Sequence, residues 1–189
     1  VYVQVGGYSP IKANIRLDDD SLCVGEQTFM IASARGGYGG QAEYQYHWSV
    51  QDETTNILFA RPPNTRLYTV TISDLWLSEP GVDTVMIHVG KPVPPMFEVS
   101  PDEVCIQTDV LIRLTNFNEL FNYRWAFGDG DTLFNFNIDS IFYTFSKPGC
   151  YDLNIAAVSE FGCFSQRTET CAVKVLNQPE AKFENHPSE

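Results

Sequence analysis

The chain has 189 residues with thirteen Phe, nine Tyr and three Trp, and its 12 basic and 24 acidic residues give a formal net charge of −12 at pH 7. This acidic balance disfavours nucleic acid and anionic membranes as partners, because phosphate groups are bound by clustered Lys and Arg. No run approaches the roughly eighteen apolar residues of a membrane-spanning helix, so we expect no membrane insertion of this segment.

Strand-like patterns organise the first half of the chain. Val1 to Val5 alternates and ends in two glycines, much as Val85 to Val89 ends in Gly90. Residues 1–8 are therefore expected to be the last strand of a preceding repeat. The next predicted domain comprises residues 9–91. Its sequence repeatedly shows the period-two alternation that is typical of half-buried strands. The predicted strands are 13–17, 28–32, 44–50, 66–73 and 82–89, separated by loops that include 18–25, 35–40 and 74–81.

A stiff linker separates this domain from a second one. Lys91 to Pro95 contains three prolines, which favour an extended polyproline geometry. The second domain is predicted at residues 92–178. The pattern that begins it at Phe97 recurs at Phe183, one domain length later. Residues 179–189 are therefore expected to be the truncated opening strand of a following repeat, as in an array of like modules.

Two stretches of the second domain resemble a known family. The first, Tyr123 to Asp131, joins an alternating aromatic strand to a Gly/Asp turn, and a Pro-Gly corner later leads into a second alternating strand. Together they resemble the polycystic kidney disease (PKD) repeat, an extracellular β-sandwich marked by Trp-Asp-Phe-Gly-Asp-Gly, His-x-Tyr and Pro-Gly-x-Tyr. The chain departs from this pattern at Ala126 (Asp in the family), Tyr143 (His) and Phe145 (Tyr). The matching residues are Trp125, Phe127, Gly128, Asp129, Gly130, Pro148, Gly149 and Tyr151.

The predicted fold class is all-β, with two tandem immunoglobulin-like, PKD-like β-sandwiches. Trp48 is expected to be the first-domain counterpart of Trp125, buried in an equivalent core position. In immunoglobulin-like sandwiches a Tyr at the start of a late strand anchors a corner of the chain, and Tyr151 is expected to do so here.

Hairpin register predicts a disulfide between Cys150 and Cys171. A short loop separates the last two predicted strands, and if Val158 faces Cys163 across it, then Cys150 faces Cys171 at disulfide distance. Alternation along the strands places these two cysteines on opposite faces. A single bulge in the last strand would reconcile the two arguments.

The other three cysteines leave two pairings open. Cys163 is expected to pair either with Cys105 inside its domain or with Cys23 of the first domain, and one thiol stays free in either case. The sequence has no Cys-x-x-Cys spacing and its three histidines are scattered, so no zinc site is expected. Five cysteines in all-β domains suit an oxidising, extracellular setting.

Aromatic residues in predicted loops are the candidate ligand contacts. Tyr38 and Trp76 lie in the second-to-third and sixth-to-seventh strand loops, which share one end of an immunoglobulin-like sandwich. They suit either stacking on a sugar ring or packing against a neighbouring module, and packing is favoured. The equivalent loops of the second domain carry Phe117, Phe121 and Phe161.

No catalytic or metal site is predicted. Asp129 and Asp131, and the run 18–20, invite a calcium hypothesis, but turn formation explains them better. His47 is expected to point to the opposite face from the buried Trp48, towards solvent. Without a nucleophile, phosphate-loop or zinc-protease motif, the chain is predicted to be no enzyme and to need no cofactor.

A short pattern, Asp-Ser/Thr followed by an aliphatic residue, occurs four times. It resembles the O-glycosylation sequon of secreted Bacteroidetes proteins, whose type IX secreted adhesins and gliding-motility proteins carry similar arrays. The resemblance implies O-glycans on Ser21, Thr84, Thr132 or Ser140.

We therefore expect a non-catalytic spacer and adhesion module of a long, multi-repeat protein. It would lie outside the cell or on its surface, associated with the outer membrane. Neighbouring repeats, a surface polysaccharide or another cell-surface protein are the expected partners. The alternatives are a carbohydrate-binding accessory module of a secreted hydrolase, or a structural piece of a secretion or motility machine.

Overall fold

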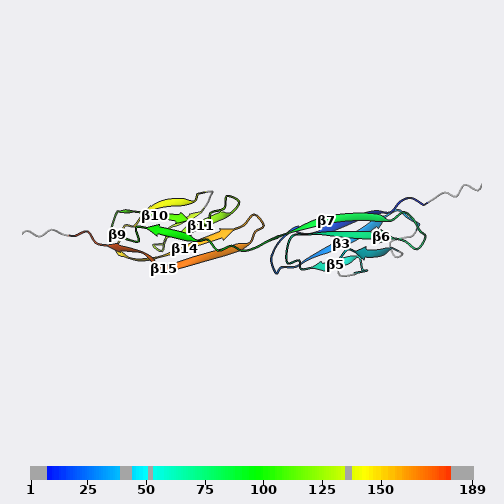
Figure 1. Cartoon of the computed structure of the whole chain (residues 1–189), viewed down its shortest axis with the longest axis horizontal. Helices are drawn as coiled ribbons and strands as arrows, with labels where there is room; N and C mark the ends of the chain where they lie inside the picture. Colours follow the sequence, from blue (N-terminus) through cyan, green and yellow to red (C-terminus); the bar gives the residue numbers. More distant parts are fainter. Residues whose placement is uncertain (1–7, 39–43, 51–52, 135–137, 180–189) are drawn as a thin grey trace, which may run out of the picture. The chain divides into compact units, whose positions relative to one another are not determined.

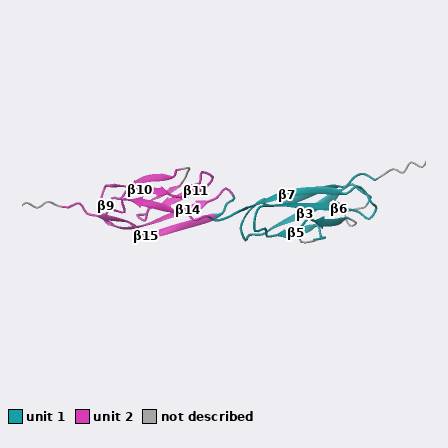
Figure 2. Cartoon of the chain, viewed as in Figure 1, with its two compact units in different colours: residues 1–92, 161–163 teal, residues 93–160, 164–189 magenta. Residues whose placement is uncertain are grey.

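The computed structural model describes residues 8–38, 44–50, 53–134 and 138–179. These residues form fifteen β-strands and contain no helix (Figure 1). They divide into two compact units, residues 1–92 with 161–163 and residues 93–160 with 164–189 (Figure 2). None of the described segments is a helix long and apolar enough to span a bilayer.

Unit 1 is a sandwich of two sheets. One has the strand order β1-β3-β5 and the other β2-β7-β6-β4, with β2 parallel to β7. Residues of β3 alternate between buried and exposed along its whole length, as expected of a strand with one face on a core. The strands are β1 (Lys12–Leu17), β2 (Ser21–Cys23), β3 (Thr28–Arg35), β4 (Gln45–Trp48), β5 (Ile57–Ala60), β6 (Arg66–Ser73) and β7 (Gly81–Gly90).

The core of unit 1 lies between these sheets and surrounds Trp48. This side chain is 0% exposed, and its indole N–H donates a hydrogen bond to the Thr55 carbonyl at 3.0 Å. Met30, Leu58 and Ile72 are buried in the same cluster.

Unit 2 repeats the same plan. Its sheets have the orders β13-β10-β8 and β12-β11-β14-β15-β9, and β9 pairs in parallel with the last strand. The strands are β8 (Phe97–Ser100), β9 (Glu103–Cys105), β10 (Asp109–Leu114), β11 (Asn122–Ala126), β12 (Thr132–Phe134), β13 (Ser140–Thr144), β14 (Gly149–Val158) and β15 (Phe164–Leu176).

The aromatic strand and the Pro-Gly corner organise the core of unit 2. Trp125 is 1% exposed and lies in the central cluster. Gly128 has φ +83°, and a Cβ there would lie 2.5 Å from the Asp152 carbonyl oxygen, so this turn requires glycine. The Tyr151 hydroxyl donates to the Lys147 carbonyl at 2.8 Å, which is the corner contact predicted for it.

The predicted fold class is confirmed, including the burial of both tryptophans. Most strands were found from the sequence, whereas six were not assigned: β2, β5, β9, β10, β12 and β13. Residues 1–7 and 180–189, which carry most of the two predicted partial repeats, lie outside the described residues.

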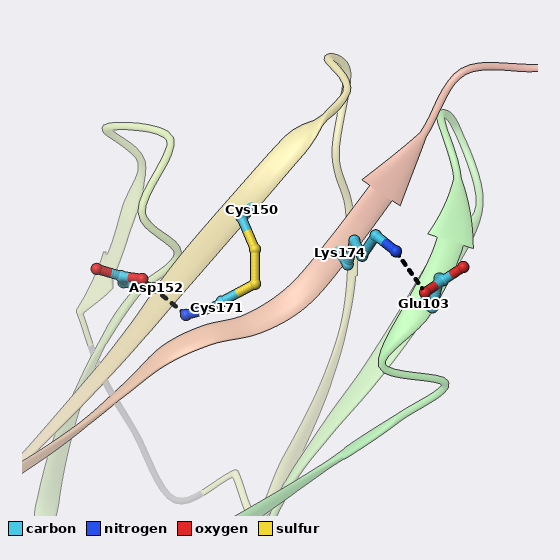
Figure 3. The surroundings of a disulfide bond; sticks show 5 residues. All are labelled: Glu103, Cys150, Asp152, Cys171 and Lys174. Carbon is cyan, nitrogen blue, oxygen red and sulfur yellow. Dashed lines mark hydrogen bonds and ion pairs between the residues drawn. A yellow bond between two sulfur atoms is a disulfide. The ribbon is translucent and has the colours of Figure 1, made fainter.

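A disulfide joins Cys150 and Cys171, with 4.9 Å between their Cα atoms (Figure 3). The register used to predict this pair is wrong. Val158 pairs with Phe164 rather than Cys163, and Cys150 pairs with Lys174.

A bulge brings the two sulfur atoms together. The register of β14 and β15 shifts between Tyr151 and Leu153, so that Asp152 faces the extra residues of β15. Cys171 adopts φ 52° in this bulge, and its N–H donates to the Asp152 carboxylate at 2.8 Å (Figure 3). The bulge removes the conflict between strand register and side-chain alternation, because the strand no longer keeps one alternation.

The second disulfide joins Cys23 and Cys163, which are 140 residues apart in sequence. Both belong to unit 1, since the hairpin tip 161–163 groups with that unit (Figure 2). Of the two pairings left open by the sequence, the structure has the one to Cys23, and Cys105 is the free thiol.

Candidate functional site

The loop between β6 and β7 is built around the carboxylate of Asp74. This side chain is buried and accepts four hydrogen bonds. Its Oδ1 accepts the N–H groups of Trp76 at 3.0 Å and Ser78 at 3.1 Å. Its Oδ2 accepts the Tyr38 N–H at 3.0 Å and the Ser78 hydroxyl at 2.7 Å. One carboxylate therefore ties the β6–β7 loop to the loop after β3.

The surroundings of Asp74 favour its ionised form. The hydroxyl of Ser78, with the three backbone N–H groups, lowers the pKa of Asp74 from 3.8 to about 2 against the opposing effect of burial. Gly37 adopts φ +71°, and a Cβ there would lie 2.6 Å from Oδ2 of Asp74. Glycine at this position lets the backbone approach the carboxylate closely.

Three aromatic rings lie over this loop. Tyr38 is in contact with Trp76, with 4.7 Å between ring centroids in an edge-to-face arrangement, and with Tyr8 at 4.5 Å. The sequence prediction that Tyr38 and Trp76 share one end of the sandwich is thus matched by their geometry. Tyr8 was missed as a site residue, because the sequence analysis assigned residues 1–8 to a preceding repeat, whereas Tyr8 groups with unit 1.

Two leucines extend the aromatic surface. Leu75 is 66% exposed, Trp76 50% and Leu77 95%, and Leu77 has a positive φ of 57°. We call the five side chains Tyr8, Tyr38, Leu75, Trp76 and Leu77 the apolar tip. None of them is charged, and the hydrogen bonds to Asp74 hold the loop that presents them.

The second-domain aromatics are arranged differently. Phe117 and Phe121 pack against Tyr123, with centroid distances of 5.7 and 6.4 Å, and belong to the margin of the core. Phe161 groups with unit 1, where its ring is stacked on His88 at 5.8 Å. The five aromatics predicted as one class therefore fall into three separate places.

A tyrosine hydroxyl lies between the two aspartates of the Gly-Asp-Gly-Asp turn. Tyr143, which stands where the PKD family has His, donates to Asp129 at 2.6 Å, and Asp131 lies within 3.1 Å of the same oxygen. Burial and both carboxylates raise the pKa of Tyr143 above its usual 10.0. Asp129 also accepts the Asp131 N–H at 3.0 Å, which is a turn contact. Within the described ranges, no three His, Cys, Asp or Glu side chains gather as a metal site would require.

His47 is exposed on β4, next to the buried Trp48, in agreement with strand alternation. Its imidazole lies beside a shallow hollow with Tyr44 and Thr54. General acid–base catalysis there would need a nucleophile held by the imidazole and an acid orienting it.

A groove on the outer face of unit 2 was not found from the sequence. It has a volume of about 340 Å³ and an apolar floor of Ala156 and Val158 between Phe134 and Phe164. The guanidinium of Arg124 lies 5.3 Å from the centre of the Phe134 ring. Sheet register places Arg124 opposite both Phe134 and Ala156, so the groove could only be anticipated once that register was known.

The four candidate glycosylation residues all reach the surface, with Thr84 and Thr132 the more exposed. The Ser21 and Ser140 hydroxyls donate to the preceding aspartates at 3.1 and 2.9 Å. At Thr84 it is the backbone N–H that donates to the preceding Asp83, at 2.9 Å.

Comparison with known proteins supports the fold alone. No protein-family model and no curated protein matches the sequence. Murine CEACAM1b is similar over 87% of this chain and all of its own, with a TM-score of 0.52 and 12% identity. A three-domain titin fragment, I67–I69 in an E-to-A variant, matches 88% of this chain and 65% of its own length, with a TM-score of 0.51 and 14% identity.

A third neighbour is a carbohydrate-binding module of the β-sandwich superfamily. It has 25% identity and a TM-score of 0.40, and covers 44% of this chain. The match spans 34% of that protein's length. The first two neighbours show that the chain has immunoglobulin-like β-sandwich architecture.

Proposed function

We propose that this chain is a spacer and adhesion module of a long, multi-repeat, secreted or cell-surface protein. The observation that carries the proposal is that each unit has its own buried core between two sheets, braced by disulfides, as a self-contained extracellular module would. In this proposal, the partial repeats expected at residues 1–8 and 179–189 belong to the modules on either side, although Tyr8 itself packs against Tyr38 of unit 1.

A domain exchange in the complete gene tests the spacer role. Deleting residues 9–178 should abolish attachment of the cell to its surface, because the distal binding domain loses its reach. Replacing the same residues by two immunoglobulin-like domains of unrelated sequence should restore attachment. Failure of the replacement, with the protein still displayed on the cell, would mean that this segment itself carries the binding specificity.

PKD-type ancestry and a Bacteroidetes source, with type IX secretion and outer-membrane association, are the finer part of the proposal. The Tyr143 hydroxyl supports the PKD assignment, since it contacts the Gly-Asp-Gly turn from the position that is His in that family. O-glycans on Ser21, Thr84, Thr132 and Ser140 belong to the same proposal. An intact mass equal to the bare polypeptide, measured on protein from its own host, would refute the glycans.

Carbohydrate binding remains the second candidate because Tyr38 and Trp76 are in contact and partly exposed. Two features weigh against it. The carboxylate of Asp74 is fully engaged within the loop, and exposed leucines flank the tryptophan instead of hydrogen-bonding side chains. A glycan array probed with the wild-type chain and with Trp76→Ala decides between the candidates.

A further inference from the structure

We infer that two copies of this chain associate through β5, the edge strand of the β1-β3-β5 sheet of unit 1. The partner is the same strand of a second copy, paired antiparallel. The inference goes beyond the proposed function, because a spacer requires no contact between copies.

The backbone of β5 is open to a further strand. Among the described strands it pairs with β3 alone, in a continuous antiparallel register. The Ala32 N–H donates to the Asn56 carbonyl at 2.8 Å, so that by alternation the backbone groups of Ile57 and Phe59 point away from β3. The Thr55 hydroxyl donates to the Ile57 carbonyl at 2.7 Å, which agrees with that direction and leaves this oxygen a second lone pair.

Four apolar side chains lie on the outer face of the sheet at this edge. The register places Phe29 opposite Phe59, with 6.4 Å between their ring centroids, and places Ile31 opposite Ile57. Phe59 is 68% exposed and the other three are 38% exposed. The four residues of β5 include no charged side chain, proline or bulge of the kind that protects an edge strand from pairing. The edge therefore offers both outward-pointing backbone groups and apolar side chains to an added strand.

The charges at the two ends of β5 favour its own copy as that strand. Glu53 precedes β5 and Arg61 follows it directly, and neither forms an ion pair with another of the described residues. Antiparallel pairing brings Glu53 of each copy near Arg61 of the other, within the diagonal reach of long side chains. Parallel pairing would instead place like charges together. The strand is thus complementary to itself in the antiparallel orientation.

Pairing centred on Leu58 uses the outward-pointing groups fully. It sets Ile57 of each copy opposite Phe59 of the other, and each such pair exchanges two backbone hydrogen bonds. The β1-β3-β5 sheet then continues into the second copy, and the apolar side chains of both copies become neighbours on one face. Because β5 has only four residues, the contact is small and the association is expected to be reversible.

Sedimentation equilibrium of the 189-residue chain measures this association. Salt at roughly 0.15 M screens the net charge of −12 beyond about 8 Å, so the long-range repulsion between copies is largely removed. We expect a reversible dimer under these conditions. A chain that stays monomeric up to about 1 mM would overturn the inference and leave the edge to a strand of another protein.

Two variants at one position test the backbone contact. Ile57→Pro removes an outward-pointing N–H, and proline is tolerated in edge strands where the N–H faces solvent. This variant should weaken dimerisation about tenfold or more, since the two-fold symmetry removes the bond twice. Ile57→Val keeps the N–H and should leave dimerisation nearly unchanged. Equal dimerisation of both variants, with circular dichroism showing both folded, would contradict pairing through β5.

A matched pair of phenylalanines tests the side-chain contact. Phe59→Ser should weaken dimerisation about tenfold, because the apolar cross-strand pair is lost twice. Phe142 is 69% exposed on β13, the edge strand of a unit 2 sheet, so Phe142→Ser is the control and should have no effect. Weakening by Phe142→Ser but not by Phe59→Ser would place the contact on unit 2 and refute the inference.

Charge reversal tests the orientation of the two strands. Glu53→Arg and Arg61→Glu each bring like charges together at both ends of the contact, so either variant alone should dimerise more weakly than wild type. An equimolar mixture of the two variants should recover association as a heterodimer, because each end then has one acidic and one basic residue. Failure of the mixture to recover association would refute antiparallel pairing of β5, whatever the outcome for the proposed spacer role.

Discussion

Asp74 shows how one buried carboxylate sets the conformation of a loop. Because its pKa is lowered from 3.8 to about 2, the folded chain binds this proton less readily than the unfolded chain. The stabilisation is therefore complete above the usual pKa and is lost as the pH falls through about 2. We expect the fluorescence of Trp76 to stay constant from neutral pH to about 4 and to change towards pH 2.

Asp74→Asn should remove this pH dependence, because the amide does not titrate. It should also loosen the loop at neutral pH, because the side-chain nitrogen of Asn donates hydrogen bonds and cannot accept the N–H and O–H groups that the carboxylate accepts. Amide hydrogen exchange at Tyr38, Trp76 and Ser78 should become faster. Glu79→Gln, in the same loop and exposed, serves as the control and should change neither signal. Equal effects of both substitutions would contradict the role given to Asp74.

Tyr143 joins the aromatic core to the Gly-Asp turn. Its ring is stacked on Phe127 at 3.8 Å, while its hydroxyl lies between Asp129 and Asp131. Tyr143→Phe keeps the stack and removes the hydroxyl, so it should lower the free energy of unfolding by about 1 kcal/mol. Because the pKa of Tyr143 is raised, its contribution is present below pH 10 and is lost at still higher pH.

Chemical denaturation of the two proteins measures this cost. Tyr143→Ala should be more destabilising, since it also removes the contacts with Phe127 and Phe145. If Tyr143→Phe is as stable as wild type at neutral pH, the hydroxyl contributes nothing net and the turn is held by its backbone alone.

At the scale of elements, strands with a clear period-two alternation were predictable, whereas the three-residue strands were not. Segment 66–73 was predicted with its observed bounds, because eight residues establish a period of two. Strands of three residues, such as β2 and β12, give too few alternations to detect. The Tyr38–Asp74 hydrogen bond spans 36 residues and depends on how loops fold, so no local pattern could reveal it.

The β14–β15 hairpin illustrates a correct pair reached through a wrong register. A bulge shifts the pairing, because between the Tyr151–Val173 and Leu153–Glu169 pairs β14 has one residue and β15 has three. The bond closes a loop with a sequence separation of 21 residues, so its loss should destabilise unit 2 by about 3 kcal/mol through the unfolded chain. The double variant Cys150→Ala, Cys171→Ala should accordingly unfold at lower temperature.

Cys105→Ser is the matched control for that measurement, because Cys105 is the free cysteine and lies at the end of β9. A small effect of this variant beside a large effect of the double variant would assign the loss to the disulfide. Equal melting temperatures for the double variant and wild type would contradict it.

At the scale of the whole molecule, unit 1 is built from two separate parts of the sequence. The chain leaves unit 1 after Pro92 and contributes residues 161–163 to it again. The sequence predicted a linker from its prolines but left the partner of Cys163 open, since sequence spacing carries no information on a pair 140 residues apart.

This arrangement makes a direct prediction for a chain cut in the linker. A protease site inserted after Lys91 places Cys23 in one fragment and Cys163 in the other. After cleavage, denaturing electrophoresis without reductant should show a single species of the original mass, because the Cys23–Cys163 bond still joins the fragments. Adding reductant should release two fragments.

Two variants serve as controls. In Cys163→Ser the fragments should separate without reductant, whereas in the double variant at Cys150 and Cys171 they should stay joined, since that second bond lies within one fragment. Separation of the cleaved wild-type chain under oxidising conditions would refute the Cys23–Cys163 pairing.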